Sequence, residues 1–144
     1  MAIKLQGTRI DDTTGGNSGV EPRIGIMYTE MVGRRGYSLQ KFVDLTSANA
    51  ARIMGLYPRK GAIAPGGDAD IAVLDTSRKF RITKEMLHET DYSPWEGHEV
   101  YGWPQLTILR GKVVVKNGEF CGNLNDGQYL YRKLSDEVRA GVLR

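Results

Sequence analysis

Two histidines and the acidic residues near them are the groups in this sequence best suited to bind a metal ion. His88 and His98 are the only histidines, and Asp91, Glu96 and Glu99 lie close to both along the chain. Imidazole and carboxylate groups are the usual ligands of a zinc ion that activates water for amide hydrolysis. The spacing matches neither His-x-His nor His-Glu-x-x-His, and a solvated polar loop explains these residues more simply. We therefore expect no metal ligands here. An enzyme built on the two histidines is the alternative.

Other catalytic signatures are missing from the sequence. It contains no Gly-x-Ser-x-Gly motif, no P-loop and no spaced set of cysteines. The single cysteine, Cys121, cannot form an internal disulfide, which is typical of a reducing compartment. Asp70 could be a ligand, but a turn carboxylate that accepts backbone N–H groups is the favoured interpretation. We predict no catalytic residue in this chain.

Charge and hydropathy exclude some partners. The formal charge of +3 comes from 20 basic and 17 acidic residues, which are spread along the chain. Such a distribution does not predict a nucleic-acid partner. No apolar run approaches the roughly 18 residues that a membrane span requires, and the first residues lack a signal-peptide apolar block. We predict a soluble, cytoplasmic chain with no membrane partner.

Apolar periodicity predicts helices in the first part of the chain, after a polar loop that runs to Gly19. Residues recur at spacings of three and four from Val20 to Gly33, namely Val20, Ile24, Met27, Tyr28 and Met31. Ser38 is expected to cap a second helix with the stripe Leu39, Phe42, Val43 and Leu45. Thr46 or Ser47 is expected to cap a third helix, which Gly55 ends.

After Pro65 the spacing of apolar residues changes from that of a helix to that of extended strands. Residues 71–74, a turn at 75–78 and the alternating residues 79–82 predict an antiparallel pair. The segment 83–97 is expected to be irregular, with one helical turn. Residues 106–115, followed by Asn117-Gly118, predict a further hairpin, because Asn-Gly favours a type I′ turn. The remaining residues predict a polar loop and a short helix.

Three blocks of the sequence resemble the hydantoinase/dihydropyrimidinase branch of the amidohydrolases. They are Gly-Gly-Asn-Ser-Gly-Val-Glu-Pro-Arg at 15–23, the segment 49–75, and Asp-Tyr-Ser-Pro-Trp-Glu-Gly at 91–97 with 108–114. They follow the order and spacing of that family. The resemblance implies that the chain is the C-terminal portion of such an enzyme, in which helices close a barrel and the later strands belong to a β sandwich.

The implied fold class is α+β. Residues 1–62 would be a barrel-derived loop and helices, 63–120 a small antiparallel β-sandwich-like unit, and 121–144 a tail suited to subunit contact. This arrangement is incomplete relative to the family, because the N-terminal strands that complete the sandwich have no counterpart here. Helical stripes without their barrel partners would expose apolar side chains, so we expect a homo-oligomer or the missing N-terminal part of the same enzyme as partner.

The resemblance also implies hydrolysis of C–N bonds in cyclic amides by two divalent metals such as zinc. The His-x-His pair, bridging lysine, later histidines and aspartate that hold these metals in the family have no counterpart here. We therefore predict that this chain binds no cofactor and is inactive by itself. A non-catalytic oligomerisation or interaction module is the alternative function.

The implied substrate-binding residues are Gly15, Gly16 and Asn17. The asparagine that is common in the family's substrate loop falls on Gly15, which leaves only a backbone contact. Glycine permits such a contact because no Cβ interferes. A flexible glycine loop without a ligand is the other interpretation. The choice among hydantoin, dihydropyrimidine or another ring stays open.

Overall fold

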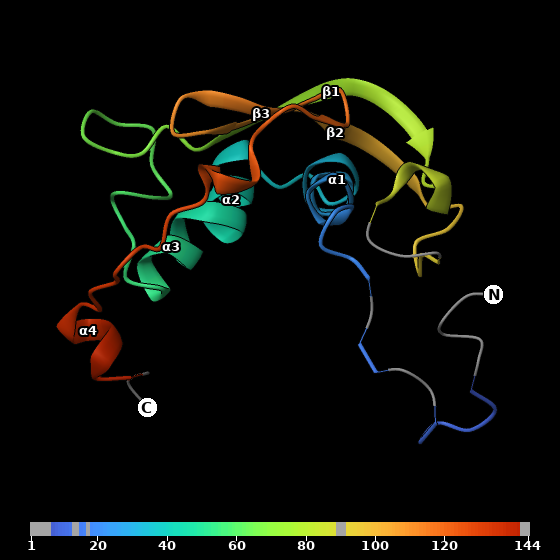
Figure 1. Cartoon of the computed structure of the whole chain (residues 1–144), viewed down its shortest axis with the longest axis horizontal. Coiled ribbons are helices and arrows are strands. Elements are labelled where there is room, and N and C mark those ends of the chain that lie inside the picture. Colours follow the sequence, from blue (N-terminus) through green and yellow to red (C-terminus); the bar gives the residue numbers. More distant parts are fainter. Residues whose placement is uncertain (1–6, 13–14, 17, 89–91, 142–144) are drawn as a thin grey trace.

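The chain folds as an α+β unit with helices followed by one four-stranded antiparallel sheet, in the order β1-β2-β3-β4. The computed structural model describes residues 7–12, 15–16, 18–88 and 92–141. Figure 1 shows the curved sheet lying across the helices, with α1 beneath the strands and the tail helix α4 far from them. The predicted fold class is therefore correct at this level.

Two helical stretches precede the sheet. The first combines α1 (Arg23–Tyr28) and η2 (Thr29–Arg34), and the second combines α2 (Leu39–Val43), η3 (Asp44–Ala48) and α3 (Asn49–Ile53). Ser38 caps α2 as predicted, since its Oγ accepts the N–H of Lys41 at 3.1 Å. The predicted boundary at Thr46 or Ser47 is wrong. Thr46 lies inside the second stretch, where its hydroxyl donates to the Phe42 carbonyl at 2.7 Å and leaves the helix unbroken.

The sheet consists of β1 (Ile71–Arg81), β2 (Glu99–Leu109), β3 (Lys112–Lys116) and β4 (Glu119–Phe120). The predicted hairpin at 75–78 is wrong. Residues 71–81 form one strand, β1, which pairs with β2 both before and after the expected turn. Asp75 pairs with Trp103 and Lys79 with Tyr101, so the turn-forming residues between them bulge out of the pairing. The predicted Asn117-Gly118 turn is confirmed, with φ of 54° and 89° at its two residues.

The remaining elements are short. They are η4 (Lys84–Met86), η5 (Leu124–Asp126) and α4 (Asp136–Arg139), and η4 is the helical turn expected within 83–97. The tail returns to the helices, where the N–H of Lys133 donates to the Gly55 carbonyl at 3.0 Å. Gly55 ends the second helical stretch as predicted and has φ of +70°. None of the helices in the described part of the chain is long and apolar enough to cross a bilayer.

The core lies between α1 and the sheet, around Ile26, Ile82, Leu87 and Val100, with Phe80, Trp95 and Trp103 packed against it. The predicted apolar stripe of the first helix is partly wrong. Met31 is buried, but Val20 is 71% exposed, while Ile26 and Thr29 are buried. Thr29 carries no apolar signal, so the spacing of large apolar residues did not mark the face that packs on the sheet.

A close helix–strand contact, here called the α1–β2 seam, joins Gly25 and Thr29 to Tyr101, Gly102 and Trp103. A Cβ at Gly25 would lie 2.5 Å from the Trp103 ring, and one at Gly102 would lie 2.7 Å from the Tyr28 ring. The hydroxyl of Thr29 donates to the Gly25 carbonyl at 2.7 Å and accepts the N–H of Tyr101 at 2.8 Å. The seam therefore fixes where α1, and the loop that leads into it, meet the sheet.

Candidate functional site

The predicted substrate-binding residues lie in the segment 15–19, here called the glycine loop. Gly15 and Gly16 are exposed, whereas Asn17 lies outside the described residues. A Cβ placed on Gly15 or Gly16 would meet nothing within 4 Å, and Gly16 has φ of +82°. None of the described residues therefore crowds the Cα atoms of these two glycines, and a ligand can approach their backbone.

The glycine loop is attached to the segment 83–98, which connects β1 to β2. The N–H of Ser18 donates to the hydroxyl oxygen of Tyr92 at 3.2 Å, and the hydroxyl of Ser18 donates to the Tyr92 carbonyl at 3.3 Å. The structure thus brings together the first and third blocks of the resemblance, which are far apart in the sequence.

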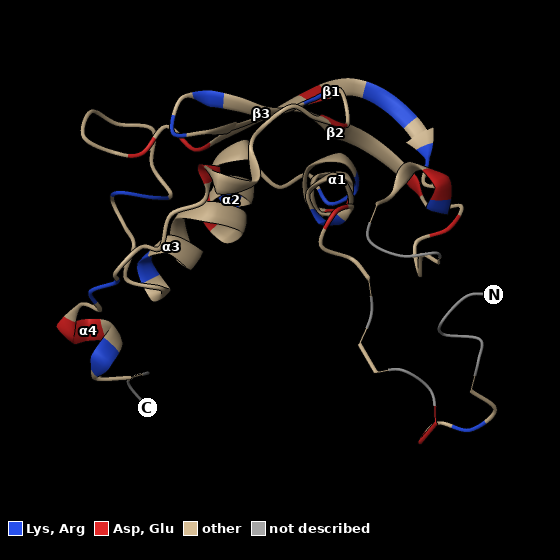
Figure 2. Cartoon of the chain, in the orientation of Figure 1, with Lys and Arg blue, Asp and Glu red and all other residues tan. Residues whose placement is uncertain are grey.

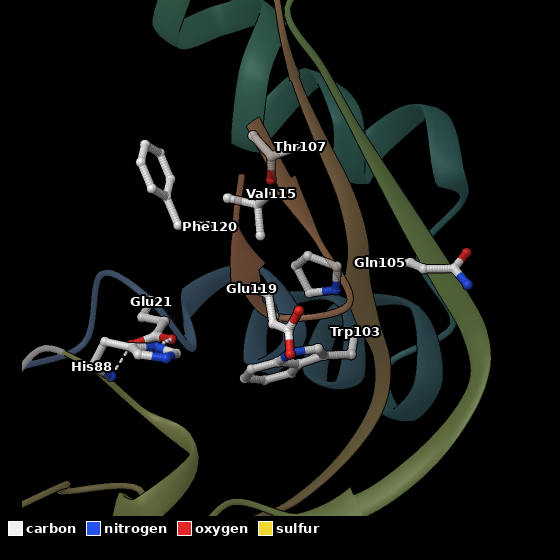
Figure 3. Close-up of a pocket in the computed structure, with 10 residues that line it drawn as sticks. Glu21, His88, Trp103, Gln105, Thr107, Val115, Glu119 and Phe120 are labelled. Carbon is white, nitrogen blue, oxygen red and sulfur yellow. Dashed lines mark hydrogen bonds and ion pairs between the residues drawn. The ribbon is translucent and has the colours of Figure 1, made fainter. Parts of the chain in front are cut away.

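A second attachment joins Glu21 to His88. One carboxylate oxygen of Glu21 accepts the N–H of His88 at 2.7 Å, and the other lies 2.8 Å from Nδ1 of the same residue. Figure 3 shows the two side chains facing each other at the rim of a cavity. The contact between Nδ1 of His88 and Glu21 therefore joins the start of α1 to the segment 83–98.

The cavity beside this pair has a volume of about 520 Å³ and is lined by residues of β2, β3 and β4. Trp103, Phe120 and Val115 give it apolar walls, and Glu119 also lines it (Figure 3). Among the described residues, its lining contains carboxylates, an amide, a threonine and one imidazole, but no cysteine or serine. The cavity can accommodate an apolar group but offers no nucleophile paired with a base.

The possible metal ligands do not converge. His98 packs edge-on against Trp95 with ring centroids 5.6 Å apart, and its Nε2 is buried without a hydrogen-bond partner among the described residues. Glu96 accepts the N–H of Lys84 at 2.8 Å. Glu99 accepts the Tyr101 hydroxyl at 3.0 Å, and this hydrogen bond lowers the pKa of the carboxyl group. Asp91 lies outside the described residues.

Among the residues that the structure describes, no group of three His, Cys, Asp or Glu side chains could hold a metal ion. The donor set present in this part of the chain therefore does not fit the pair of divalent metals that the resemblance implies. His88 is instead hydrogen-bonded to Glu21, and His98 packs against Trp95.

Asp70 belongs to a cluster of charged side chains. Lys60 forms ion pairs with Asp70 and, at 2.9 Å, with Asp68, while Oδ1 of Asp70 accepts the N–H of Arg110 at 2.8 Å. The predicted role as an acceptor of a backbone N–H is thus confirmed. Partial burial opposes ionisation of Asp70, but hydrogen bonds from Lys60 and Arg110 outweigh it and lower its pKa. Lys60 also lowers the pKa of Asp68 by hydrogen bonding. The cluster joins the segment before β1 to the β2–β3 turn.

We expect Asp70→Asn to weaken the fold at neutral pH and to reduce its sensitivity to acid. Because the pKa of Asp70 is lower in the folded state, its contribution to the free energy of unfolding is present above the unfolded pKa of about 4 and is lost as pH falls through the folded pKa. Urea unfolding should show a loss of about 1 kcal/mol at pH 7 that shrinks at lower pH. Asp136→Asn is the control, because that side chain is fully exposed. An unchanged pH dependence in Asp70→Asn would contradict this role.

Sequence reasoning missed the partners of the glycine loop. Ser18, Glu21 and Tyr92 stand inside the quoted blocks, yet no spacing rule pairs residues so far apart in a chain. The one available signal was that the first and third blocks both occur in register with the same family. Such co-occurrence does not say which side chains touch.

Comparison with known proteins assigns the family. The model of the amidohydrolase family matches residues 6–114. The D-phenylhydantoinase of Escherichia coli O1:K1 is 39% identical over 136 residues, and the alignment covers 92% of this chain and 30% of that protein. The D-hydantoinase of Ralstonia pickettii is 40% identical over 119 residues, which cover 82% of this chain and 26% of that protein. The chain therefore belongs to the amidohydrolase family, as the three sequence blocks predict.

Solved structures agree with this assignment. The D-hydantoinase from Bacillus sp. AR9 superposes with a TM-score of 0.82 at 39% identity, covering 88% of this chain and 28% of that chain. The L-hydantoinase (dihydropyrimidinase) from Arthrobacter aurescens gives a TM-score of 0.76 at 33% identity. The superposition covers 83% of this chain and 27% of that chain. This chain spans about 30% of the length of the first relatives it matches.

Proposed function

We propose that these residues are the C-terminal portion of a metal-dependent hydrolase that acts on C–N bonds of cyclic amides, in the manner of hydantoinases and dihydropyrimidinases. The observation that carries the proposal is the 39% identity to a D-phenylhydantoinase over 136 residues, which extends across both the helices and the sheet. In this proposal, residues 1–62 pack on a catalytic barrel and residues 63–120 complete a β sandwich. Residues 121–144 form the tail.

The proposal divides the work between this chain and the rest of the enzyme. Opening an unstrained cyclic amide requires activated water and a polarised carbonyl, which two divalent metals such as zinc supply when bound. The residues described here contain no donor set for them. This chain is therefore proposed to be inactive by itself, with the metal ligands on the remaining part of the polypeptide.

The chain's own contribution would be the glycine loop. A cyclic diamide presents N–H and C=O groups along one ring edge, and exposed backbone groups of Gly15 and Gly16 can pair with them. Because glycine lacks a Cβ, the ring can approach the backbone closely. Asn17 is part of the proposed contact as well. The role of the loop is to orient the ring.

Ring-opening assays test this proposal. We expect the product of the complete reading frame, extended upstream into the barrel, to open hydantoin or dihydrouracil in the presence of zinc or manganese. The 144-residue chain, assayed identically, should give no rate above the metal-containing buffer. The proposal fails if the 144-residue chain opens either ring unaided, or if the extended polypeptide opens no cyclic amide.

Exposed apolar side chains are compatible with the alternative, a non-catalytic oligomerisation module. The second helical stretch exposes large apolar side chains, with exposed fractions of 59% for Leu39, 45% for Val43, 46% for Leu45, 62% for Ile53 and 48% for Met54. Each such side chain gains roughly 1.5–3 kcal/mol when it is buried. Covering these side chains with a second copy of the chain, or with the missing N-terminal part, would therefore stabilise the protein.

We expect the 144-residue chain to sediment as a dimer or larger species at micromolar concentration, because association would bury these side chains. Leu39→Glu or Ile53→Glu should shift the distribution towards the monomer. Lys41→Gln is the control, since it changes the net charge by the same amount on an exposed position of the same stretch. A monodisperse monomer for the unmodified chain would rule out the module and leave the hydrolase fragment as the only candidate.

The proposed location is the cytoplasm. The single cysteine is typical of a protein that folds without disulfides. We propose no nucleic-acid or membrane partner. Basic and acidic residues are both scattered along the chain, and basic residues gather near the end of β1 (Figure 2).

A further inference from the structure

The glycine loop begins with two glycines that have no side-chain neighbours among the described residues, and it is joined to the segment 83–98 at Ser18. No atom lies within 4 Å of a Cβ built on Gly15 or Gly16. A glycine pair without side-chain contacts has high conformational freedom, which must be lost before its backbone can bind a ligand. The first described residue after this pair that forms a hydrogen bond in the fold is Ser18, which bonds twice to Tyr92.

The segment that carries Tyr92 is anchored to the core. Ile82 and Leu87, near its beginning, are buried. The N–H of Gly97 donates to the Ile82 carbonyl at 2.8 Å, and the N–H of Ile82 donates to the His98 carbonyl at 2.9 Å. Trp95 packs against the core cluster. The segment that contacts the glycine loop is therefore itself held against the core.

We propose that Tyr92 is a positioning residue that holds the glycine loop in place for the substrate, and that the Glu21–His88 pair assists it by fixing the start of α1. The proposal rests on the function proposed above, in which the loop contacts a cyclic amide. Tyr92 acts through Ser18: its hydroxyl oxygen holds the backbone N–H of Ser18, three residues from Gly15.

The expected effect is on substrate binding, because the loop must be ordered before its backbone can pair with the ring. Backbone groups that bind a ring edge lose their alignment when the loop samples other positions. Holding Ser18 at both its N–H and its hydroxyl restricts these positions before the substrate arrives, so less ordering remains for the substrate to induce.

The first test measures the attachment itself in the 144-residue chain. Tyr92→Phe removes the acceptor of the Ser18 N–H and keeps the ring. We expect amide hydrogen exchange at Ser18 to become about fivefold faster, which corresponds to the loss of one ordinary hydrogen bond. Exchange at Val100 in the core should not change. Tyr129→Phe is the control, because Tyr129 is 81% exposed in the tail. Unchanged exchange at Ser18 would overturn the attachment.

The second test measures the consequence for substrate in the extended polypeptide. We expect Tyr92→Phe to raise KM about fivefold, because the loop is less ordered before binding. Ser18→Ala, which removes the other hydrogen bond to Tyr92, should raise KM by a similar factor. A role in folding alone would lower the apparent kcat and leave KM unchanged, and that result would overturn the proposal.

The two tests separate this inference from the function on which it rests. If the unmodified extended polypeptide opens no ring, the proposed function fails and Tyr92 positions no substrate. The exchange rates at Ser18 still decide whether Tyr92 holds the loop. If the extended polypeptide is active and KM is insensitive to both substitutions, the proposed function stands and the positioning role is wrong.

Discussion

The hydroxyl of Thr29 is the contact on which the arrangement of this chain depends. It is fully buried and satisfies the N–H of Tyr101 in β2 while it donates to the Gly25 carbonyl in α1. A buried backbone N–H without a partner is costly, so this hydroxyl makes the close approach of helix and strand possible. The glycines on either side of it leave room for the Trp103 and Tyr28 rings.

Everything proposed for the glycine loop follows from that placement. The loop leads directly into α1, whose position against β2 is set by the α1–β2 seam. The segment 83–98 leaves the same sheet and returns to the loop through Tyr92 and His88. Helix, sheet and loop therefore constrain one another. In the proposed function, a segment without metal ligands among its described residues would affect where a substrate lies through these contacts.

The sequence predicts those features that depend on local chemistry. Ser38 as a cap, Gly55 as a helix end and Asn117-Gly118 as a turn all follow from backbone preferences of single residues. The family likewise follows from three blocks in register.

Other features depend on distant partners and could not be predicted in this way. Residues 76–78 of the predicted turn form a bulge because β2 pairs with β1 on both sides of them. Thr29 is in the core because Tyr101 needs an acceptor, which no apolar pattern reveals. For the same reason, the partners of Ser18 and Glu21 were found only in the structure.

The most direct test of the central claim is the free energy of unfolding of Thr29→Val, with Thr29→Ser as the control. Valine keeps the shape of threonine but removes the hydroxyl, and serine keeps the hydroxyl. Urea unfolding should show a loss of about 1–3 kcal/mol for valine and a smaller loss for serine. A Thr29→Val protein as stable as the parent would show that the α1–β2 seam does not organise this fold.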